Sequence, residues 1–416
     1  MRVLMLAQSF APIIGGEERV VENLSRELSG RGHEVAIATL KQPGVEPTPC
    51  DGVRIHALRS SVSRLSPADS ERLYSPPLPD PETARDLRRV IREERPDVVH
   101  AHNWIVHSYL PLDRRTDAAL VLSLHDYGLI CPTKRLLRDG GVCSGPGPLK
   151  CVLNARDQYG LAKGAVAVAG TLTREGTVRR HVDLFLPISS TVAELCRLGP
   201  EDRYRITPNF IGELPPAPAG DDPALARLPE GPFVLYFGDL TEDKGVRHLI
   251  EVYDTLEAPP PLVLIGRNYL GELTERPGVQ ALGPLPYPLT IEALRRSTFT
   301  VAPSIWAEPF GMVALEAARA GKPIVASDIG GLKDIVVDDE TGLLVPAGDG
   351  AALGSALRRL IADGPLRERL GAAAARRAEE AFSPTSLVPQ VEESYRLAIE
   401  ARGDRRRSQS NKAGMA

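Results

Sequence analysis

The residues most able to do chemistry gather between Ser304 and Glu316, at the joint between two predicted elements. Glu308 lies in a loop that follows an apolar run, residues 299–302, which is typical of a buried strand. Glu316 lies inside a predicted helix over residues 313–320. A loop that leads into a helix directs free N–H groups and a partial positive charge outward, so it favours an anion. The amides expected to do this belong to Phe310, Gly311, Met312 and Val313.

Two carboxylates beside such an amide-rich turn indicate what kind of ligand would bind. Carboxylates accept hydrogen bonds from hydroxyls and repel phosphate. The pattern therefore predicts a ligand with sugar hydroxyls near Glu308 and Glu316 and a phosphate near the amides. The alternative is that both glutamates are solvated surface residues without a ligand.

A second polar loop, residues 238–245, also lies between a predicted strand and a predicted helix. Lys244 would neutralise a diphosphate there, whereas Asp239 carries the opposite charge. One contact between unit charges at about 4 Å is worth roughly 4 kcal/mol at an effective dielectric near 20, so Asp239 would weaken diphosphate binding. Three outcomes stay open: Asp239 turns away and pairs with a base, Arg267 supplies the missing cation, or diphosphate binding is altered.

Polar residues also follow predicted strands in the first half of the chain. His125 ends the strand at residues 119–124 and precedes Asp126. Ligands of open α/β sheets bind beyond the carboxyl ends of strands, so we expect His125 to be functional. His100, His102 and His107 could equally be structural, and their spacing completes no metal site. Gly16 lies in the turn after the first strand, which lacks the Gly-x-Gly-x-x-Gly pattern of nicotinamide-binding proteins.

Strands and helices alternate in two successive sets, which predicts an α/β protein with two parallel sheets. The predicted strands are residues 3–7, 35–40, 54–58, 97–102, 119–124, 183–188 and 204–207, and then 233–237, 262–265, 279–282, 299–302, 323–326 and 342–345. We expect an N-terminal domain at 1–212, with a cysteine-containing insert at about 129–156, and a C-terminal domain at 213–382. A last helix at 383–401 and a disordered tail at 402–416 complete the prediction.

The composition excludes several classes of protein. A chain of 416 residues with 43% hydrophobic and 25% charged residues is typical of a globular protein. A formal net charge of −4 and an aromatic content of 5% argue against a nucleic-acid binder. Residues 1–7 are too short for a signal peptide and no apolar run reaches about 18 residues, so we expect a cytoplasmic protein.

The motifs together resemble a known family. Glu308 and Glu316 with seven residues between them, in the context Pro-Ser, Glu-Pro-Phe-Gly and Glu-Ala, resemble the retaining GT-B glycosyltransferases of family 4, the glycosyl transferases group 1. The resemblance implies two Rossmann-like, doubly wound parallel-sheet domains that face a cleft, with a C-terminal helix that crosses back to the first domain. It also implies a UDP- or GDP-linked sugar as donor substrate, and no metal or other cofactor.

The same resemblance assigns roles to individual residues. Glu316 would accept hydrogen bonds from the ribose, Glu308 would hold the sugar, and Lys244 would stabilise the leaving diphosphate with the amides. Gly16 would lie near the donor diphosphate, and His125 would contact the transferred sugar on the acceptor side. Relatives usually carry Arg where this chain has Asp239. Gly330-Gly331 resembles a glycine pair beside the donor, although a plain turn is an equal alternative.

Three cysteines fall in the insert: Cys131, Cys143 and Cys151. Many relatives carry a fourth cysteine where this chain has Asn154. Three thiolates and an amide make a poor zinc site, so metal binding by these cysteines stays open and no metal is expected.

The resemblance predicts a retaining hexosyltransferase that acts on a hydroxyl acceptor in polysaccharide, glycolipid or glycosylated-metabolite biosynthesis. The alternatives are a nucleotide-sugar epimerase or hydrolase of the same fold, and a non-catalytic relative that acts as a binding partner. No nucleic-acid partner is expected, and the basic residues 405–407 leave peripheral contact with the inner face of a membrane open. The sequence does not specify the donor base, the sugar, the acceptor or the oligomeric state.

Overall fold

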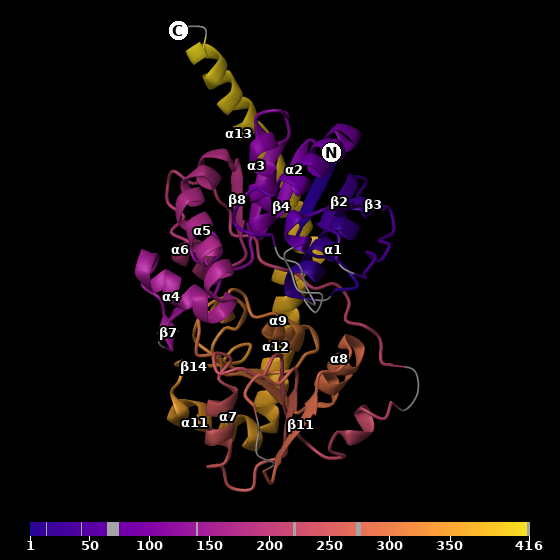
Figure 1. Cartoon of the computed structure of the whole chain (residues 1–416). Helices are drawn as coiled ribbons and strands as arrows, with labels where there is room; N and C mark the ends of the chain where they lie inside the picture. Colours follow the sequence, from indigo (N-terminus) through magenta and orange to yellow (C-terminus); the bar gives the residue numbers. More distant parts are fainter. Residues whose placement is uncertain are drawn as a thin grey trace. The chain divides into compact units, whose positions relative to one another are not determined.

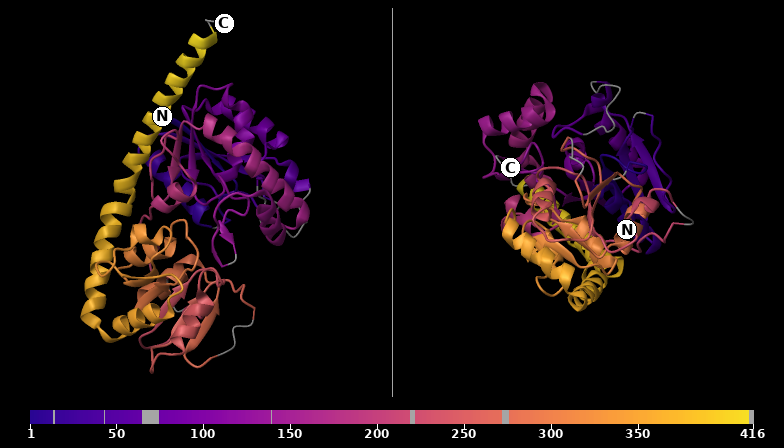
Figure 2. Two further views of the ribbon diagram at one scale, coloured as in Figure 1. Left: turned by 90° about the vertical axis from the view of Figure 1, so that its left-hand side faces the viewer. Right: turned by 90° about the horizontal axis from the view of Figure 1, so that it is seen from below.

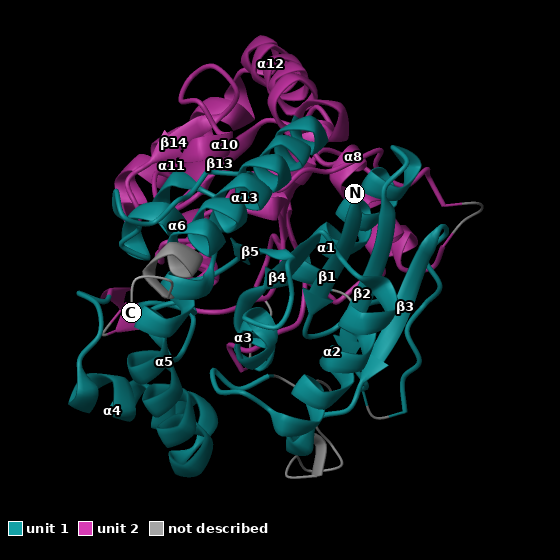
Figure 3. Cartoon of the chain, turned by 90° about the horizontal axis from the view of Figure 1, so that it is seen from above, with its two compact units in different colours: residues 1–136, 143–208, 387–416 teal, residues 137–142, 209–386 magenta. Residues whose placement is uncertain are grey.

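The computed structural model describes residues 1–13, 15–42, 44–64, 75–138, 140–218, 222–271 and 276–413. The chain forms two compact units (Figures 1 and 3). Unit 1 comprises residues 1–136, 143–208 and 387–416, and unit 2 comprises residues 137–142 and 209–386. The short hairpin β6–β7 (Leu137–Arg138 and Gly141–Val142) is grouped with unit 2, and the chain passes from unit 1 into the main part of unit 2 after residue 208.

Unit 1 is built on a parallel sheet, as predicted, and this sheet has six strands. The strand predicted at residues 204–207 is wrong, because only an isolated bridge between Tyr204 and Phe185 forms there. The order of the sheet is β3 (Val53–Leu58), β2 (Glu34–Leu40), β1 (Arg2–Ala7), β4 (Val98–His102), β5 (Ala119–Leu124) and β8 (Leu184–Pro187). The central strands are covered on both faces, which explains their nearly continuous apolar sequences. The strand order reverses between β1 and β4, and in such sheets ligands bind beyond the carboxyl ends of the strands at this point.

The helices of unit 1 connect these strands. They are α1 (Gly16–Gly30), α2 (Pro81–Glu94), α3 (Val106–Asp113), α4 (Pro148–Tyr159), α5 (Leu161–His181) and α6 (Ser190–Leu195), with short 3-10 turns η1 (Ser61–Arg64) and η2 (Asn103–Ile105). Two of them begin at side chains that accept backbone N–H groups, Asp80 before α2 and Ser189 before α6.

Unit 2 repeats the same architecture, also as predicted. Its six parallel strands have the order β11 (Val279–Gly283), β10 (Leu262–Ile265), β9 (Val234–Phe237), β12 (Phe299–Ala302), β13 (Ile324–Ser327) and β14 (Leu343–Val345). Its helices are α7 (Val246–Tyr253), α8 (Tyr287–Arg296), α9 (Met312–Arg319), α10 (Leu332–Ile335), α11 (Gly350–Ala362) and α12 (Gly364–Phe382), with the 3-10 turn η3 (Leu225–Arg227).

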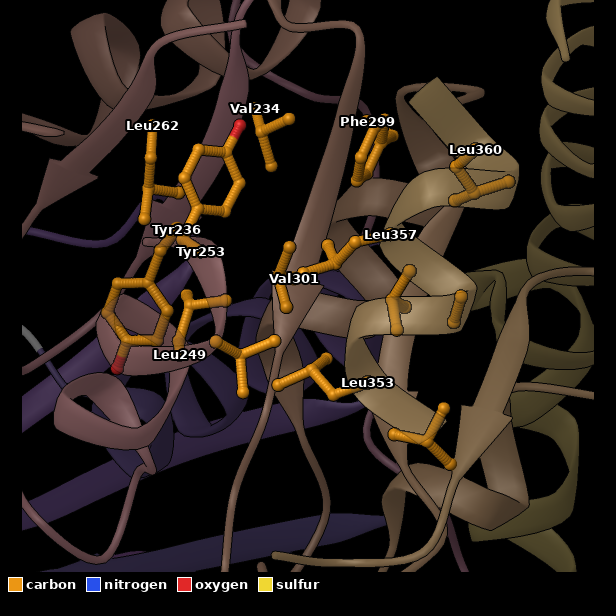
Figure 4. Packing of buried hydrophobic residues seen from close by; sticks show 14 of the residues in the cluster. Val234, Tyr236, Leu249, Tyr253, Leu262, Phe299, Val301, Leu353, Leu357 and Leu360 are labelled. Carbon is orange, nitrogen blue, oxygen red and sulfur yellow. The ribbon is translucent and has the colours of Figure 1, made fainter. Parts of the chain in front are cut away.

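One face of the unit 2 sheet is packed by α7 and α11. Figure 4 shows Val234 and Val301 of the sheet among Leu249 of α7 and Leu353 and Leu357 of α11, all of them buried. This core holds β9 and β12 side by side, so the loops that follow the two strands leave the sheet together.

The last helix, α13 (Pro384–Ala413), corrects the prediction of a disordered tail after residue 401. The left view of Figure 2 shows it as one continuous yellow helix. Residues 387 onward belong to unit 1, which confirms that the C-terminal helix returns to the first domain. Residues 414–416 of the predicted tail lie outside the described residues.

Ion pairs explain why the helix continues through its basic end. Arg402 is 5% exposed and lies 2.9 Å from Asp113 Oδ1 and 3.8 Å from Asp183 Oδ2. Arg405 lies 2.9 Å from Asp183 Oδ1 and donates to the carbonyl oxygens of residues 180–182. Composition suggests a solvated tail, but buried carboxylates of unit 1 bind these two arginines. No helix in the described part of the chain combines the length and the hydrophobicity that a membrane span requires.

We expect Arg402→Ala to destabilise the protein by about 3 to 5 kcal/mol, because it leaves buried carboxylates without their partner. Chemical denaturation followed by circular dichroism measures this change. The matched control is Arg407→Ala, on the same helix, since the Arg407–Asp404 pair is exposed and should contribute less than about 1 kcal/mol. Equal effects of the two substitutions would contradict this account of α13.

Candidate active site

The loop between β12 and α9 carries Glu308, whose carboxylate is fixed on both oxygens. Lys244 Nζ lies 2.5 Å from Glu308 Oε1, and Ser304 Oγ donates to Oε2 at 3.0 Å. Glu308 is 9% exposed, whereas the Lys244 side chain is 26% exposed. The structure thus brings together two residues that lie 64 positions apart and that the sequence proposed separately for the same chemistry.

Close backbone packing brings the two loops together. The N–H of Ile305 donates to the carbonyl of Asp243 at 2.9 Å. Gly245 has φ +70°, and a Cβ at this position would lie 2.0 Å from the carbonyl oxygen of Pro303. Only glycine fits such a contact in the left-handed region, so Gly245 is needed to place Lys244 beside Glu308.

Gly330 and Gly331 support the same loop from the β13 side. A Cβ on Gly330, which has φ +63°, would lie 2.2 Å from the carbonyl oxygen of Glu308. The N–H of Gly331 donates to that oxygen at 2.7 Å. The sequence left two interpretations of this glycine pair open, a contact with the donor and a plain turn. The structure shows that both glycines pack closely against the backbone of the Glu308 loop.

The start of α9 presents the predicted amides. Gly311 precedes the helix with φ +99°, and the N–H groups of Gly311, Met312 and Val313 have no hydrogen-bond acceptor among the described residues. The Phe310 side chain is instead part of the core, 3% exposed and edge-on to Phe382 at 6.2 Å. Three free amides at a helix start can hold one anionic group.

Glu316 lies in α9 and is 4% exposed. Its side chain is therefore enclosed by the fold, unlike an idle solvated glutamate. Along the chain, Glu308 precedes the amide-rich turn and Glu316 follows it inside α9.

Asp239 follows β9 and is exposed. No ion pair among the described residues involves its carboxylate, so pairing with a neighbouring base, the first of the three outcomes left open by the sequence, is not observed. Its carbonyl oxygen accepts from Tyr236 Oη at 2.8 Å. Burial, together with the nearby carboxylates of Glu308, Asp239 and Asp243, raises the pKa of Tyr236 well above its usual value, so this hydroxyl stays protonated.

Arg267 lies close to this position through its backbone. Its carbonyl oxygen accepts from the N–H of Leu240 at 2.8 Å, because the loops after β9 and β10 run side by side. Arg267 is exposed at the carboxyl end of the neighbouring strand. The backbone of Arg267 therefore lies next to the backbone of the residue that follows Asp239.

In unit 1, His125 lies at the predicted strand end and is half-buried. Its Nε2 lies 2.8 Å from Nδ1 of His102, and its backbone N–H donates to Asn103 Oδ1 at 3.3 Å. Burial, with a smaller contribution from Lys134, lowers the pKa of His125 to about 4, so the ring is neutral near pH 7. Gly16 is the exposed first residue of α1 at the same sheet edge.

Several polar residues of this edge escaped the sequence analysis. Asn103 Nδ2 donates to Glu17 Oε2 at 2.6 Å, so one amide side chain links Glu17 to the His125 backbone. Burial raises the pKa of Glu17 to about 8, opposed mainly by the positive charge of Lys134. Lys134 lies 3.8 Å from Asp126 Oδ2 and 4.4 Å from the centre of the Trp104 ring. The position of Glu17 directly after the glycine turn is the one sequence feature that could have marked it as a site residue. No sequence feature marks Lys134 or Asn103 in this way.

The cysteines of the insert act as packing residues where the structure describes them. Cys151 packs with Ala155 and Val168, and Cys131 Sγ lies 3.2 Å from Thr133 Oγ1. All five cysteines are free, and no group of three or more His, Cys, Asp or Glu suited to a metal ion occurs in the described part of the chain.

Comparison with known proteins identifies two family models along the chain. The model of glycosyl transferases group 1 matches residues 221–377, and the model of the glycosyl transferase 4-like domain matches residues 15–209. The chain is also similar to the glycogen synthase of Mycobacterium tuberculosis (strain ATCC 25618 / H37Rv), with 28% identity over 435 residues that cover 97% of this chain and 96% of that protein.

Two solved structures show the same fold. The sucrose-phosphate synthase of Thermosynechococcus elongatus matches with a TM-score of 0.72 at 21% identity, covering 96% of this chain and 99% of that chain. The HepE protein of Anabaena, in complex with UDP-glucose, matches with a TM-score of 0.64 at 17% identity, covering 94% and 98%. These likenesses confirm the predicted GT-B fold.

We expect Gly330→Ala to destabilise unit 2 by about 2 to 5 kcal/mol and to displace the Glu308 loop, since the added methyl group overlaps the backbone of Glu308. Thermal unfolding measures the first effect. Gly348→Ala is the matched control: Gly348 has φ +77° but no atom within 4 Å of its would-be Cβ, so only the strain of about 1 kcal/mol remains. A Gly330→Ala protein as stable as this control would refute the packing role.

Proposed function

The chain belongs to the glycosyl transferases group 1 family, and we propose that it moves a hexose from a nucleoside-diphosphate sugar to a hydroxyl acceptor with retention of configuration. The observation that carries this proposal is the arrangement of Lys244, Glu308 and Ser304 beside the free amides of α9. It combines a cation and N–H donors, which suit a diphosphate, with a carboxylate, which suits sugar hydroxyls.

Departure of the nucleoside diphosphate is the step that needs electrostatic help. As the bond between the anomeric carbon and the phosphate oxygen breaks, negative charge develops on that oxygen. Lys244 and the amides of Gly311 to Val313 would stabilise this charge, and fixed donors of this kind are worth several kcal/mol. The ion pair with Glu308 keeps the Lys244 ammonium in place before the donor binds.

Retention follows from attack on the same face of the sugar that the diphosphate leaves. The acceptor oxygen forms its bond to the anomeric carbon, and the acceptor proton passes to the departing phosphate oxygen. Glu308 would hold sugar hydroxyls during this exchange, and Glu316 would hold the ribose. This mechanism uses no metal ion, because Lys244 and the helix start supply the positive charge.

The exposed Asp239 is compatible with diphosphate binding at this site. Its carboxylate is exposed, so solvent weakens but does not remove its repulsion of a diphosphate, and Arg267 on the neighbouring loop would neutralise the diphosphate in place of the arginine found in relatives. The acceptor would be bound by unit 1, at the strand ends that carry His125.

Replacement of either partner of the ion pair should abolish transfer. We expect Lys244→Ala and Glu308→Ala to lower kcat by about 10²- to 10³-fold, measured as nucleotide released from UDP-, ADP- and GDP-glucose in the presence of candidate acceptors. The control is Arg247→Ala, which removes an exposed ion pair with Glu242 just beyond the same loop. Full activity in either site variant, or an equal loss in the control, would rule out the assigned roles.

The charge at position 239 can be tested separately. We expect Asp239→Arg to bind the nucleoside diphosphate as tightly as the wild-type protein or several-fold more tightly, since it exchanges repulsion for attraction. Isothermal titration calorimetry with UDP, ADP and GDP measures the affinity. The control is Glu257→Arg, which makes the same charge change at an exposed residue before β10, at the end of the sheet where the strands begin. A loss of affinity confined to Asp239→Arg would show that Asp239 itself binds the ligand.

A further inference from the structure

Three histidine rings lie in a row that runs from the middle of β4 to the carboxyl ends of β4 and β5 in unit 1. His100 and His102 are two positions apart on β4, with ring centres 4.3 Å apart. The His102 ring stacks in turn on His125, at 5.1 Å. The first two are 1% and 0% exposed, and only His125 reaches the surface of the unit.

The hydrogen bonds along this stack are unequal. Both nitrogens of His100 have hydroxyl partners, Tyr395 Oη at 2.8 Å and Ser123 Oγ at 2.7 Å. His102 uses Nδ1 for His125, and its buried Nε2 has no partner among the described residues. His125 uses Nε2 for His102, which leaves its Nδ1 available to a ligand.

All three rings are neutral near pH 7. Burial lowers the pKa of His100 to about 3 and that of His125 to about 4, and it lowers the pKa of His102 well below the usual value. The charged group that acts most on His125 is Lys134, which also favours the neutral ring. Asp126 follows His125 in sequence and lies 3.8 Å from that lysine. A neutral imidazole has one N–H donor and one acceptor nitrogen.

The contact between His102 and His125 therefore has two possible proton arrangements. If His125 Nε2 carried the proton, His102 would have to carry its own proton on Nε2, where it would be a buried donor without an acceptor. If His102 Nδ1 carries the proton, the unpartnered Nε2 is only an acceptor. Orphaned buried N–H groups are rarer and more costly than under-satisfied acceptors, so the second arrangement is the more stable.

We propose that His102 is a positioning residue that fixes His125 in the tautomer with its proton on Nδ1, so that His125 donates a hydrogen bond to its ligand and is not a general base. The ligand atom is then a hydroxyl, ring or glycosidic oxygen with a free lone pair, which a neutral carbohydrate supplies. The identity of that ligand rests on the proposed function, whereas the tautomer does not.

The backbone geometry supports this assignment. Asn103 has φ +56°, in the left-handed region that Asn tolerates, and its Oδ1 accepts from the His125 N–H. Its Nδ2 donates to Glu17. His125 is therefore held at its backbone by Asn103 and at its ring by His102, and both residues come from the end of β4.

The tautomer can be read directly by ¹⁵N NMR of the full-length protein labelled at the histidine rings, without any substrate. The expected spectrum shows His125 with a protonated Nδ1 and an unprotonated Nε2, unchanged between pH 8 and about pH 5.5. In His102→Leu the His125 signals should shift toward a mixture of tautomers. His107→Leu, which removes another buried histidine without touching His125, should leave them unchanged. A protonated Nε2 or an imidazolium ring in the wild-type protein would overturn the proposal.

The kinetics of two variants whose side chains have the same shape provide an independent test. His125→Asn keeps an N–H donor and should raise the KM of the sugar substrate that His125 contacts by no more than about tenfold, whereas the ionised carboxylate of His125→Asp can only accept hydrogen bonds and should raise that KM much further. A general-base role predicts the reverse order, and that order would also overturn the proposal. If the wild-type protein turns over no nucleotide sugar, the proposed function is wrong. The tautomer of His125 is still tested by the NMR spectra, because they need no substrate.

Discussion

The ion pair between Lys244 and Glu308 is the interaction on which the candidate site depends. It joins the loop after β9 to the loop after β12, which are neighbours in the sheet. Glycines on both sides allow this approach, because a side chain at Gly245 or Gly330 would overlap backbone atoms of the Glu308 loop or the residues just before it. The charge of the lysine is thereby kept beside the free amides of α9, where an anionic group can use both.

In unit 1, the carboxyl ends of the strands carry different chemical groups from those in unit 2. The strand ends of unit 1 carry neutral rings, an amide side chain and a carboxyl group with a raised pKa, in contrast to the ion pair of unit 2. Neutral groups of this kind suit hydroxyl-bearing ligands, whereas the ammonium and amides of unit 2 suit a diphosphate. The two units therefore share an architecture while their strand ends carry different chemical groups.

Buried charge also decides how the chain ends. Asp113 and Asp183 are buried in unit 1, and such carboxylates are costly unless they are paired. Arg402 and Arg405 pair with them and so extend α13 well past the predicted boundary. A basic stretch that composition would assign to solvent thus becomes part of the fold, and it ties the C-terminal helix to the sheet of unit 1.

Local sequence determined the strands of both sheets and the residues that follow each strand, because apolar runs and glycine turns are short-range signals, whereas helices α3 and α4 were not predicted. Glu308, Glu316, Lys244 and His125 could be named from these signals, and the structure pairs Lys244 with Glu308 and buries Glu316 in the helix that follows the same loop. Only the tertiary structure decided the long-range partners: that Lys244 pairs with Glu308, that Asn103 links Glu17 to His125, and that Arg402 finds Asp113. Pairings between residues far apart in sequence depend on strand order and on burial, which no local pattern encodes. The same holds for the neutral state of the histidine stack, since a pKa is set by the surroundings of the ring and not by the residue type.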